Sequence, residues 1–264
     1  IFWNMSMKIC PYIKLVTKVL IFFMCAVSAP SLIAYDKDKQ ISSDGIKSIV
    51  KKVVNNLSKS MEPSGTILVG SNNSTIYTRS FGFADMATKT YDSTNTQYLI
   101  GSVTKQFTAA ALLKALYDKA IRSGISEQET DKLEAYIQTE LHKPISSLDM
   151  LPETHQIWDG SMPAWANKIT PHHLLTHSSG LGEYYNLPVL KNFMVNSPDV
   201  VNIVSSFKNQ ELEFKPGAKY SYSSSGYILL GEIVEQITGA KLDVYMESVL
   251  FNPAQMHATF LATN

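Results

Sequence analysis

A short β-rich region followed by a long helical one is the feature of this sequence that most restricts its fold. Thr66–Val69 and Thr75–Phe83 are rich in β-forming residues and flank the turn-forming segment 70–74 (GSNNS), which predicts a β-hairpin. Helical periodicity precedes the hairpin at Ser43–Met61, and a long block of predicted helices follows from Ser102 onward. Because strands do not alternate with helices, this order predicts an α+β fold rather than repeated βαβ units.

Several helices are predicted after the hairpin, from Ala and Leu content or from apolar residues at helical spacing. The expected ranges are Ser102–Tyr117, Glu127–Leu141, Pro198–Phe207, Gly226–Thr238 and Leu242–Phe251. The second of these is highly charged, and we expect it to be a solvated surface insertion. Residues 144–171 are expected to be irregular, with Trp158 and Trp165 anchoring the loop.

The composition is that of a globular protein without the charge needed to bind nucleic acid. The 264 residues include 23 Lys and Arg and 23 Asp and Glu, so the formal net charge is zero. A neutral chain lacks the basic surface that neutralises phosphates, and we therefore expect no nucleic-acid partner. Hydrophobic residues make up 45% of the chain, which is enough for a packed core.

The N-terminal region has the features of an export signal. Lysines within residues 8–18 precede the apolar run Val19–Ala29, and small residues follow. We predict that residues 1–34 are a signal peptide with an upstream remnant and that residues 35–264 form the folded domain. The protein would then be exported, either periplasmic or secreted, with no stable membrane span after cleavage.

Two alternatives for this leader are less favoured. An uncleaved anchor would need about 20 apolar residues, and the apolar run is shorter. A lipid-modified Cys25 is disfavoured because residues 22–24 (FFM) lack the usual small side chains. Because Cys10 and Cys25 are the only cysteines, the mature chain would have no disulfide, thiol nucleophile or Cys-bound zinc.

Ser102 and Lys105 form the first candidate site. They open a predicted helix and are three residues apart, so the hydroxyl and the amine can face one another. A serine needs an adjacent base to become a nucleophile, and a partly buried lysine can serve. The alternative is a helix cap and a solvated lysine. A second Ser-x-x-Lys, Ser205 to Lys208, lies at the tail of a helix, and we interpret it as incidental.

Two further segments could carry chemistry. Tyr222 precedes a predicted helix within a Tyr/Ser-rich segment, and its phenol could act as a base if a nearby lysine lowers its pKa. The alternative is a loop that covers the core.

His173 and His177 are four residues apart and could share a metal, but Leu174 stands where a zinc protease has glutamate. We therefore expect these histidines to be structural and predict no metal site.

Three strings occurring in order carry a resemblance to a known family. GSVTKQFTAAALLKAL, ITPHHLLTHSSGL and FKPGAKYSYSSSGYILLGEIVEQITG resemble the serine β-lactamase/penicillin-binding protein superfamily, in its class C β-lactamase and D,D-peptidase branch. The resemblance spans Gly65 to Phe260, with an insertion between Asp118 and Ala166. It implies a β-lactamase/transpeptidase-like fold, with an antiparallel sheet flanked by helices plus an all-helical region.

The resemblance also implies roles for individual residues. Ser102 would be the acylated nucleophile, with its backbone N–H as an oxyanion donor. Lys105 would be its proton acceptor or electrostatic partner, and Tyr222 the base that works with it. Ser224 takes the third position of the family's Tyr-x-Asn motif, a substrate-binding position, where a hydroxyl has less reach than an amide.

The implied activity is that of an exported, cofactor-independent serine hydrolase. Its substrate would be a β-lactam, a D-alanyl peptide such as a peptidoglycan peptide, or a small ester. The alternative is a non-catalytic penicillin- or peptide-binding homologue of the same fold. The family's third motif, Lys or His followed by Thr/Ser-Gly, does not occur between Tyr222 and Asn264, so the resemblance implies that the chain is truncated at its C-terminus.

Overall fold

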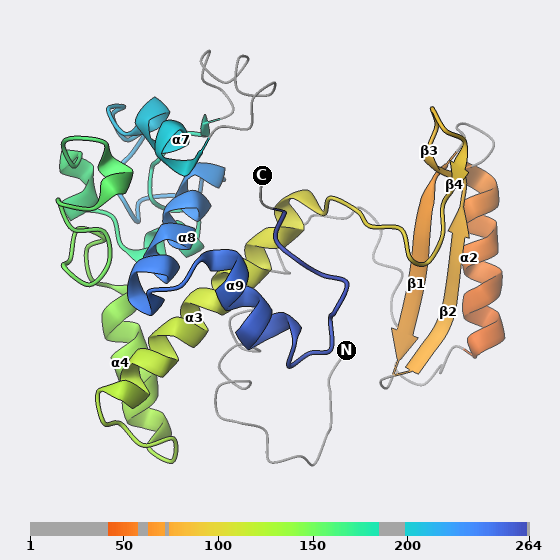
Figure 1. The fold of residues 1–264 in the computed structure, drawn as a ribbon, viewed down its shortest axis with the longest axis horizontal. Helices are drawn as coiled ribbons and strands as arrows, with labels where there is room; N and C mark the ends of the chain where they lie inside the picture. The colour runs from red at the N-terminus through yellow and green to blue at the C-terminus, as the bar shows by residue number, and fades with distance from the viewer. Residues whose placement is uncertain (1–41, 58–62, 72–73, 185–198, 263–264) are drawn as a thin grey trace. The chain divides into compact units, whose positions relative to one another are not determined.

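The computed structural model describes residues 42–57, 63–71, 74–184 and 199–262 of the chain (Figure 1). The predicted leader, residues 1–34, lies outside the described residues. The described chain divides into two compact units, one ending at Leu99 and the other beginning at Ile100. No helix within the described ranges is long and apolar enough to span a bilayer.

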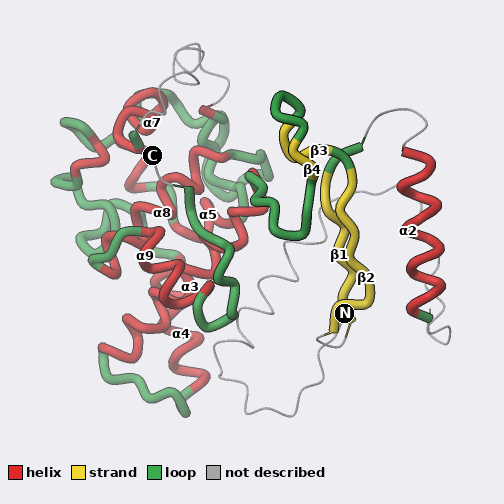
Figure 2. The backbone as a smooth tube through the Cα atoms, turned by 45° about the vertical axis from the view of Figure 1, so that its right-hand side comes forward, coloured by secondary structure: helices red, strands yellow, loops and turns green. Residues whose placement is uncertain are grey.

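The first unit contains the expected helix and hairpin. Helix α2 (Ser43–Leu57) lies beside strand β2, and strands β1 (Gly65–Ser71) and β2 (Ser74–Phe81) pair antiparallel (Figures 1 and 2). The register runs from Gly65 opposite Phe81 to Ser71 opposite Ser74, with an irregularity after Val69. The short strands β3 (Phe83–Asp85) and β4 (Thr90–Tyr91) form a second antiparallel pair.

Helix α3 (Thr104–Arg122) is the central element of the second unit. It is rich in alanine and leucine, which favour helix, and it continues directly from the 3₁₀ turn η1 (Gly101–Val103). Most of its circumference is buried, because α4, α8 and α9 all contact it (Figure 1). Its small alanines Ala111 and Ala115 are fully buried and allow these neighbours to approach closely.

Helix α4 (Thr130–Leu141) corrects one expectation. The charged sequence predicted a solvated insertion, but Leu133, Ile137 and Leu141 face the core and are almost completely buried. Glu140 is also buried, and its carboxylate bonds to Lys119 of α3 at 2.7 Å. The prediction was wrong because the charges lie on one face of an amphipathic helix whose other face packs against α3.

The loop that follows α4 is held by its tryptophans, as predicted. Trp158, in the turn η2 (Gln156–Trp158), is completely buried, and its indole N–H donates to the Pro152 carbonyl at 3.1 Å. Trp165, in the turn η3 (Ala164–Asn167), packs edge-on against Trp158 and donates to the Lys208 carbonyl at 2.9 Å. These contacts join the loop to the end of the later helix α7 (Val200–Phe207).

The remaining helices pack around α8 (Ser224–Thr238). The short helix α5 (Pro171–Leu175) begins at Thr170, whose hydroxyl caps it, and it packs against α8. Helix α8 ends at Gly239, which adopts φ 69° and closes the last turn onto the Glu235 carbonyl. Helix α9 (Leu242–Met246) continues into the π-helical turn η5 (Glu247–Phe251), close to the predicted range.

Candidate active site

Ser102 lies on the surface of the second unit, in the 3₁₀ turn that leads into α3. The preceding residue, Gly101, has φ 52°, a left-handed conformation that glycine adopts without strain. Among the described residues, Val103 N–H already donates to the Ile100 carbonyl at 3.1 Å, so the backbone donor that this first turn leaves beside the hydroxyl is the N–H of Ser102 itself.

Lys105 and Tyr222 converge on that hydroxyl. Lys105 Nζ donates to Ser102 Oγ at 3.2 Å, and the Tyr222 hydroxyl donates to the same oxygen at 2.8 Å. Lys105 Nζ also lies 4.9 Å from the centre of the Tyr222 ring. The structure therefore brings together the three side chains that the sequence proposed as catalytic, although they come from two distant segments.

Ser224, the fourth predicted residue, joins the same group. It is the first residue of α8, and Lys105 Nζ donates to its hydroxyl at 3.3 Å. Lys105 thus lies between Ser102 and Ser224. The Ser224 hydroxyl is turned toward the lysine, and the residue is buried at the edge of the site.

The electrostatics of Tyr222 favour a proton-accepting role. Partial burial acts to raise the pKa of the phenol, but the contact with Lys105 and the hydrogen bond with Ser102 outweigh it. The net pKa of Tyr222 is therefore lower than that of a free tyrosine. A lowered pKa makes the phenolate more accessible, and the phenolate is the form that accepts a proton.

The segment 177–180 holds the loop that carries Tyr222. Backbone N–H groups of Glu213, Gly217 and Ser221 donate to carbonyls of Gly180, Ser178 and His177, respectively, each at 2.8 Å. Gly180 has φ 80°, and a Cβ there would lie 2.3 Å from the Phe214 carbonyl oxygen. This close approach requires glycine.

His177 is structural, as expected, and it supports Tyr222 through a contact that the sequence did not reveal. Its ring is buried and stacks on the Tyr222 ring with centroids 4.5 Å apart, and it also contacts the Tyr227 ring at 5.2 Å. Ser223 N–H donates to His177 Nδ1 at 3.2 Å, so that nitrogen is unprotonated. Burial lowers the pKa of His177 to about 4, and the charge of Lys105 acts in the same direction.

The other candidates do not form a comparable site. Ser205 Oγ donates to an Asp159 carboxylate oxygen at 3.2 Å, whereas Lys208 Nζ donates to the backbone carbonyls of Trp158 and Asp159. These two residues therefore have separate structural partners, consistent with an incidental motif. His173 caps helix α5 from its own first turn. Among the described residues, no group of three or more His, Cys, Asp or Glu is placed to bind a metal ion.

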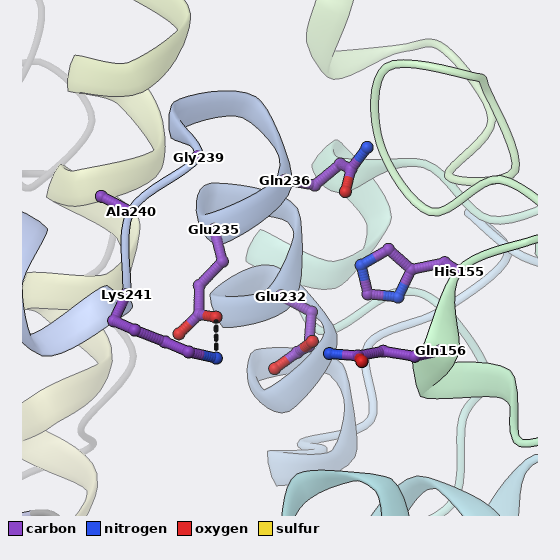
Figure 3. A pocket seen from close by; sticks show the side chains of 8 residues that line it. All are labelled: His155, Gln156, Glu232, Glu235, Gln236, Gly239, Ala240 and Lys241. Carbon is purple, nitrogen blue, oxygen red and sulfur yellow. Dashed lines mark hydrogen bonds and ion pairs between the residues drawn. The ribbon is translucent and has the colours of Figure 1, made fainter.

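A polar pocket of about 250 Å³ lies at the opposite end of α8 (Figure 3). Its polar lining comes from His155, Gln156, Glu232, Glu235, Gln236 and Lys241. Glu235 is already paired with Lys241 at 2.8 Å, and burial together with the Glu235 carboxylate raises the pKa of Glu232. None of the four candidate catalytic and binding residues lines this pocket, so it is distinct from the site at Ser102.

Comparison with known proteins identifies the family of the chain. The family model described as Beta-lactamase matches residues 53–264, and the chain therefore belongs to the β-lactamase family. A penicillin-binding protein of Bacillus subtilis is 28% identical over 202 residues, covering 74% of this chain and 37% of the relative. A D-aminopeptidase of Brucella anthropi is 28% identical over 199 residues, covering 74% of this chain and 32% of the relative. The chain thus spans less than half the length of these relatives.

A solved structure supports the fold. The crystal structure of a penicillin-binding protein from Bacillus halodurans superposes with a TM-score of 0.58 and 23% identity, over 79% of this chain and 57% of that one. Together with the family assignment, this similarity confirms the predicted α+β, β-lactamase/transpeptidase-like fold.

The shared contacts of Ser102 predict that Lys105 and Tyr222 act as one unit. Lys105→Ala and Tyr222→Phe should each slow acylation of Ser102 by about 100-fold or more, because each removes a group bonded to the same oxygen. The double variant should lose much less than the product of the single losses. Stopped-flow acylation kinetics would measure this coupling. Small, additive losses would mean that both side chains only pack beside Ser102.

The burial of His177 predicts a pH-dependent stability. Its pKa is about 4 in the folded chain against 6.5 for an ordinary histidine, so the unfolded chain binds protons more readily. The neutral, buried state of His177 therefore contributes to the free energy of unfolding. That contribution is complete above pH 6.5 and is lost as the pH falls toward 4. Urea unfolding at several pH values should show a shallower pH dependence in His177→Asn, because asparagine does not titrate and tolerates the φ of 53°.

The exposed His257 provides the control for that measurement. His257→Asn should keep the pH dependence of the unmodified protein. If His177→Asn also keeps it unchanged, His177 is not held neutral by its surroundings.

Proposed function

We propose that this chain is the site-bearing part of an exported serine hydrolase that forms an acyl-enzyme on Ser102. The observation that carries the proposal is the convergence of Lys105 Nζ and the Tyr222 hydroxyl on Ser102 Oγ, at 3.2 and 2.8 Å. A serine hydroxyl bonded to two groups that can exchange protons is an arrangement for nucleophilic catalysis. Export to the periplasm or secretion is the part of the proposal that rests on the predicted leader, residues 1–34.

The chemistry proceeds through proton transfer within this group. Tyr222 in its phenolate form, aided by the Lys105 charge, accepts the Ser102 proton as Oγ bonds to the substrate carbonyl carbon. The carbonyl oxygen becomes an oxyanion, for which the Ser102 backbone N–H is the proposed donor. When the oxyanion collapses, the C–N or C–O bond breaks and the leaving group takes the proton from Tyr222. Attack of water on the ester then releases the acid and restores Ser102.

The proposed substrates are a β-lactam, a D-alanyl peptide or a small ester. Relatives that are named as a penicillin-binding protein and a D-aminopeptidase support the first two classes. Ser102 is exposed, so a substrate carbonyl can reach it. The proposed chemistry uses neither a metal nor a cofactor.

A non-catalytic penicillin- or peptide-binding homologue is the second candidate, and Ser224 is the observation that favours it. A serine hydroxyl offers one donor where the amide of the family's Tyr-x-Asn motif offers both a donor pair and an acceptor. Fewer hydrogen bonds to the substrate amide would weaken its positioning and slow turnover. A stable adduct without turnover would therefore identify the binder.

The nucleophile is tested with a panel of chromogenic substrates. Nitrocefin, D-alanyl p-nitroanilide and p-nitrophenyl acetate represent the three substrate classes. We expect Ser102→Ala to abolish turnover of every substrate that the unmodified protein hydrolyses, while Ser205→Ala, in the incidental motif, retains it. Turnover that survives in Ser102→Ala and disappears in Ser205→Ala would refute the assignment.

A further inference from the structure

The loop of residues 182–184 wraps around the first turn of α8, next to the proposed active site. Ser225 Oγ donates to the Gly182 carbonyl at 2.7 Å, and Tyr184 N–H donates to Ser225 Oγ at 3.0 Å. Between these two contacts, Ser224 N–H donates to Glu183 Oε2 at 2.7 Å. The first turn of α8 is therefore fixed by three consecutive residues of this loop.

Glu183 makes the strongest of these contacts. It is a carboxylate bonded to a backbone N–H at the start of a helix, where the helix dipole favours negative charge. The bonded N–H belongs to Ser224, the residue whose hydroxyl accepts a hydrogen bond from Lys105 Nζ at 3.3 Å. A single residue thus separates the Glu183 carboxylate from the lysine that contacts Ser102.

The two carboxylate oxygens of Glu183 have different surroundings. Glu183 Oε1 is buried and has no hydrogen-bond partner among the residues that the structure describes. Burial of a carboxylate oxygen is unfavourable unless the group is hydrogen-bonded, and the bond from Ser224 N–H to Oε2 offsets part of that cost.

We propose that Glu183 is a positioning residue of the active site. Its carboxylate fixes the backbone of Ser224 and so keeps the short Ser224 hydroxyl within reach of Lys105 Nζ. A serine side chain has one rotatable bond before its hydroxyl, so its reach depends directly on where its backbone is held. Without this support, Lys105 would lose its hydrogen bond with the Ser224 hydroxyl, and its amine would be less well placed beside Ser102.

The kinetic consequence of this inference rests on the proposed function, but the placement itself can be measured without catalysis. The test compares Glu183→Ala, Glu183→Gln and the control Glu213→Ala in the intact protein. Glu213 lies beside the same loop, because a Cβ built on Gly182 would be 3.3 Å from Glu213 Oε1. The Glu213 side chain makes no hydrogen bond within the described ranges. The Glu183→Gln variant would keep a side-chain oxygen that can accept the Ser224 N–H.

The first readout is hydrogen exchange of the Ser224 backbone amide, followed by NMR. Glu183→Ala should speed exchange at Ser224 by about tenfold or more, because the amide loses its acceptor, whereas Glu183→Gln and Glu213→Ala should retain most of the protection. Unchanged protection of Ser224 in Glu183→Ala, with the chain still folded by circular dichroism, would overturn the proposal. If Glu183→Ala does not fold, the exchange of the Ser224 amide is compared between Glu183→Gln and Glu183→Ser. Faster exchange in Glu183→Ser than in Glu183→Gln is then expected, and equal exchange would overturn the proposal.

The second readout is the acylation of Ser102 by a fluorescent penicillin. Glu183→Ala should lower the acylation rate constant by about tenfold or more, with little change in the dissociation constant of the initial complex, and Glu183→Gln should recover most of the rate. An unchanged rate in Glu183→Ala would overturn the proposal. If the unmodified protein is not acylated at all, the proposed function fails, and the exchange of the Ser224 amide still decides the placement of Glu183.

Discussion

Packing of α3 against α8 brings together groups that lie far apart in the sequence. Ser102 lies in the turn that leads into α3, and Lys105 lies in the first turn of that helix. Tyr222 lies just before α8, whose first residue is Ser224, and the hydrogen bond from Tyr222 to Ser102 joins residues 120 positions apart. Alanines on α3 allow this packing, and the buried leucines of both helices stabilise it. A change in the relative position of the two helices would separate the serine from its proton-exchanging partners.

The charge of Lys105 links the chemistry of the site to its structural support. It lowers the pKa of Tyr222, which favours the phenolate, and contributes to the lowered pKa of His177, which favours the neutral imidazole. The neutral His177 stacks on Tyr222 and accepts a hydrogen bond from Ser223 N–H. The Lys105 charge therefore favours both an ionised Tyr222 and an uncharged His177 stacked on it. Both states suit a tyrosine that accepts the proton of Ser102.

The sequence predicted elements and short-range geometry well and predicted support residues poorly. The Ser102–Lys105 spacing places two side chains on one helical turn. The position of Tyr222 before a helix makes it a candidate base, and the family resemblance implies that it works with Lys105 on Ser102. The burial of α4 was missed because charge content hides an apolar face when only composition is considered. The support given by His177 and Glu183 was missed because their contacts come from tertiary hydrogen bonds and stacking, which no local pattern encodes.

The most direct test of the central claim is to map the covalent adduct that forms with a β-lactam. The intact protein is incubated with benzylpenicillin, quenched in acid and digested, and the modified peptide is identified by tandem mass spectrometry. We expect a penicilloyl group on Ser102 and on no other serine. An adduct on a different residue, or the absence of an adduct with β-lactam, D-alanyl and ester probes alike, would contradict the claim that Ser102 is the nucleophile.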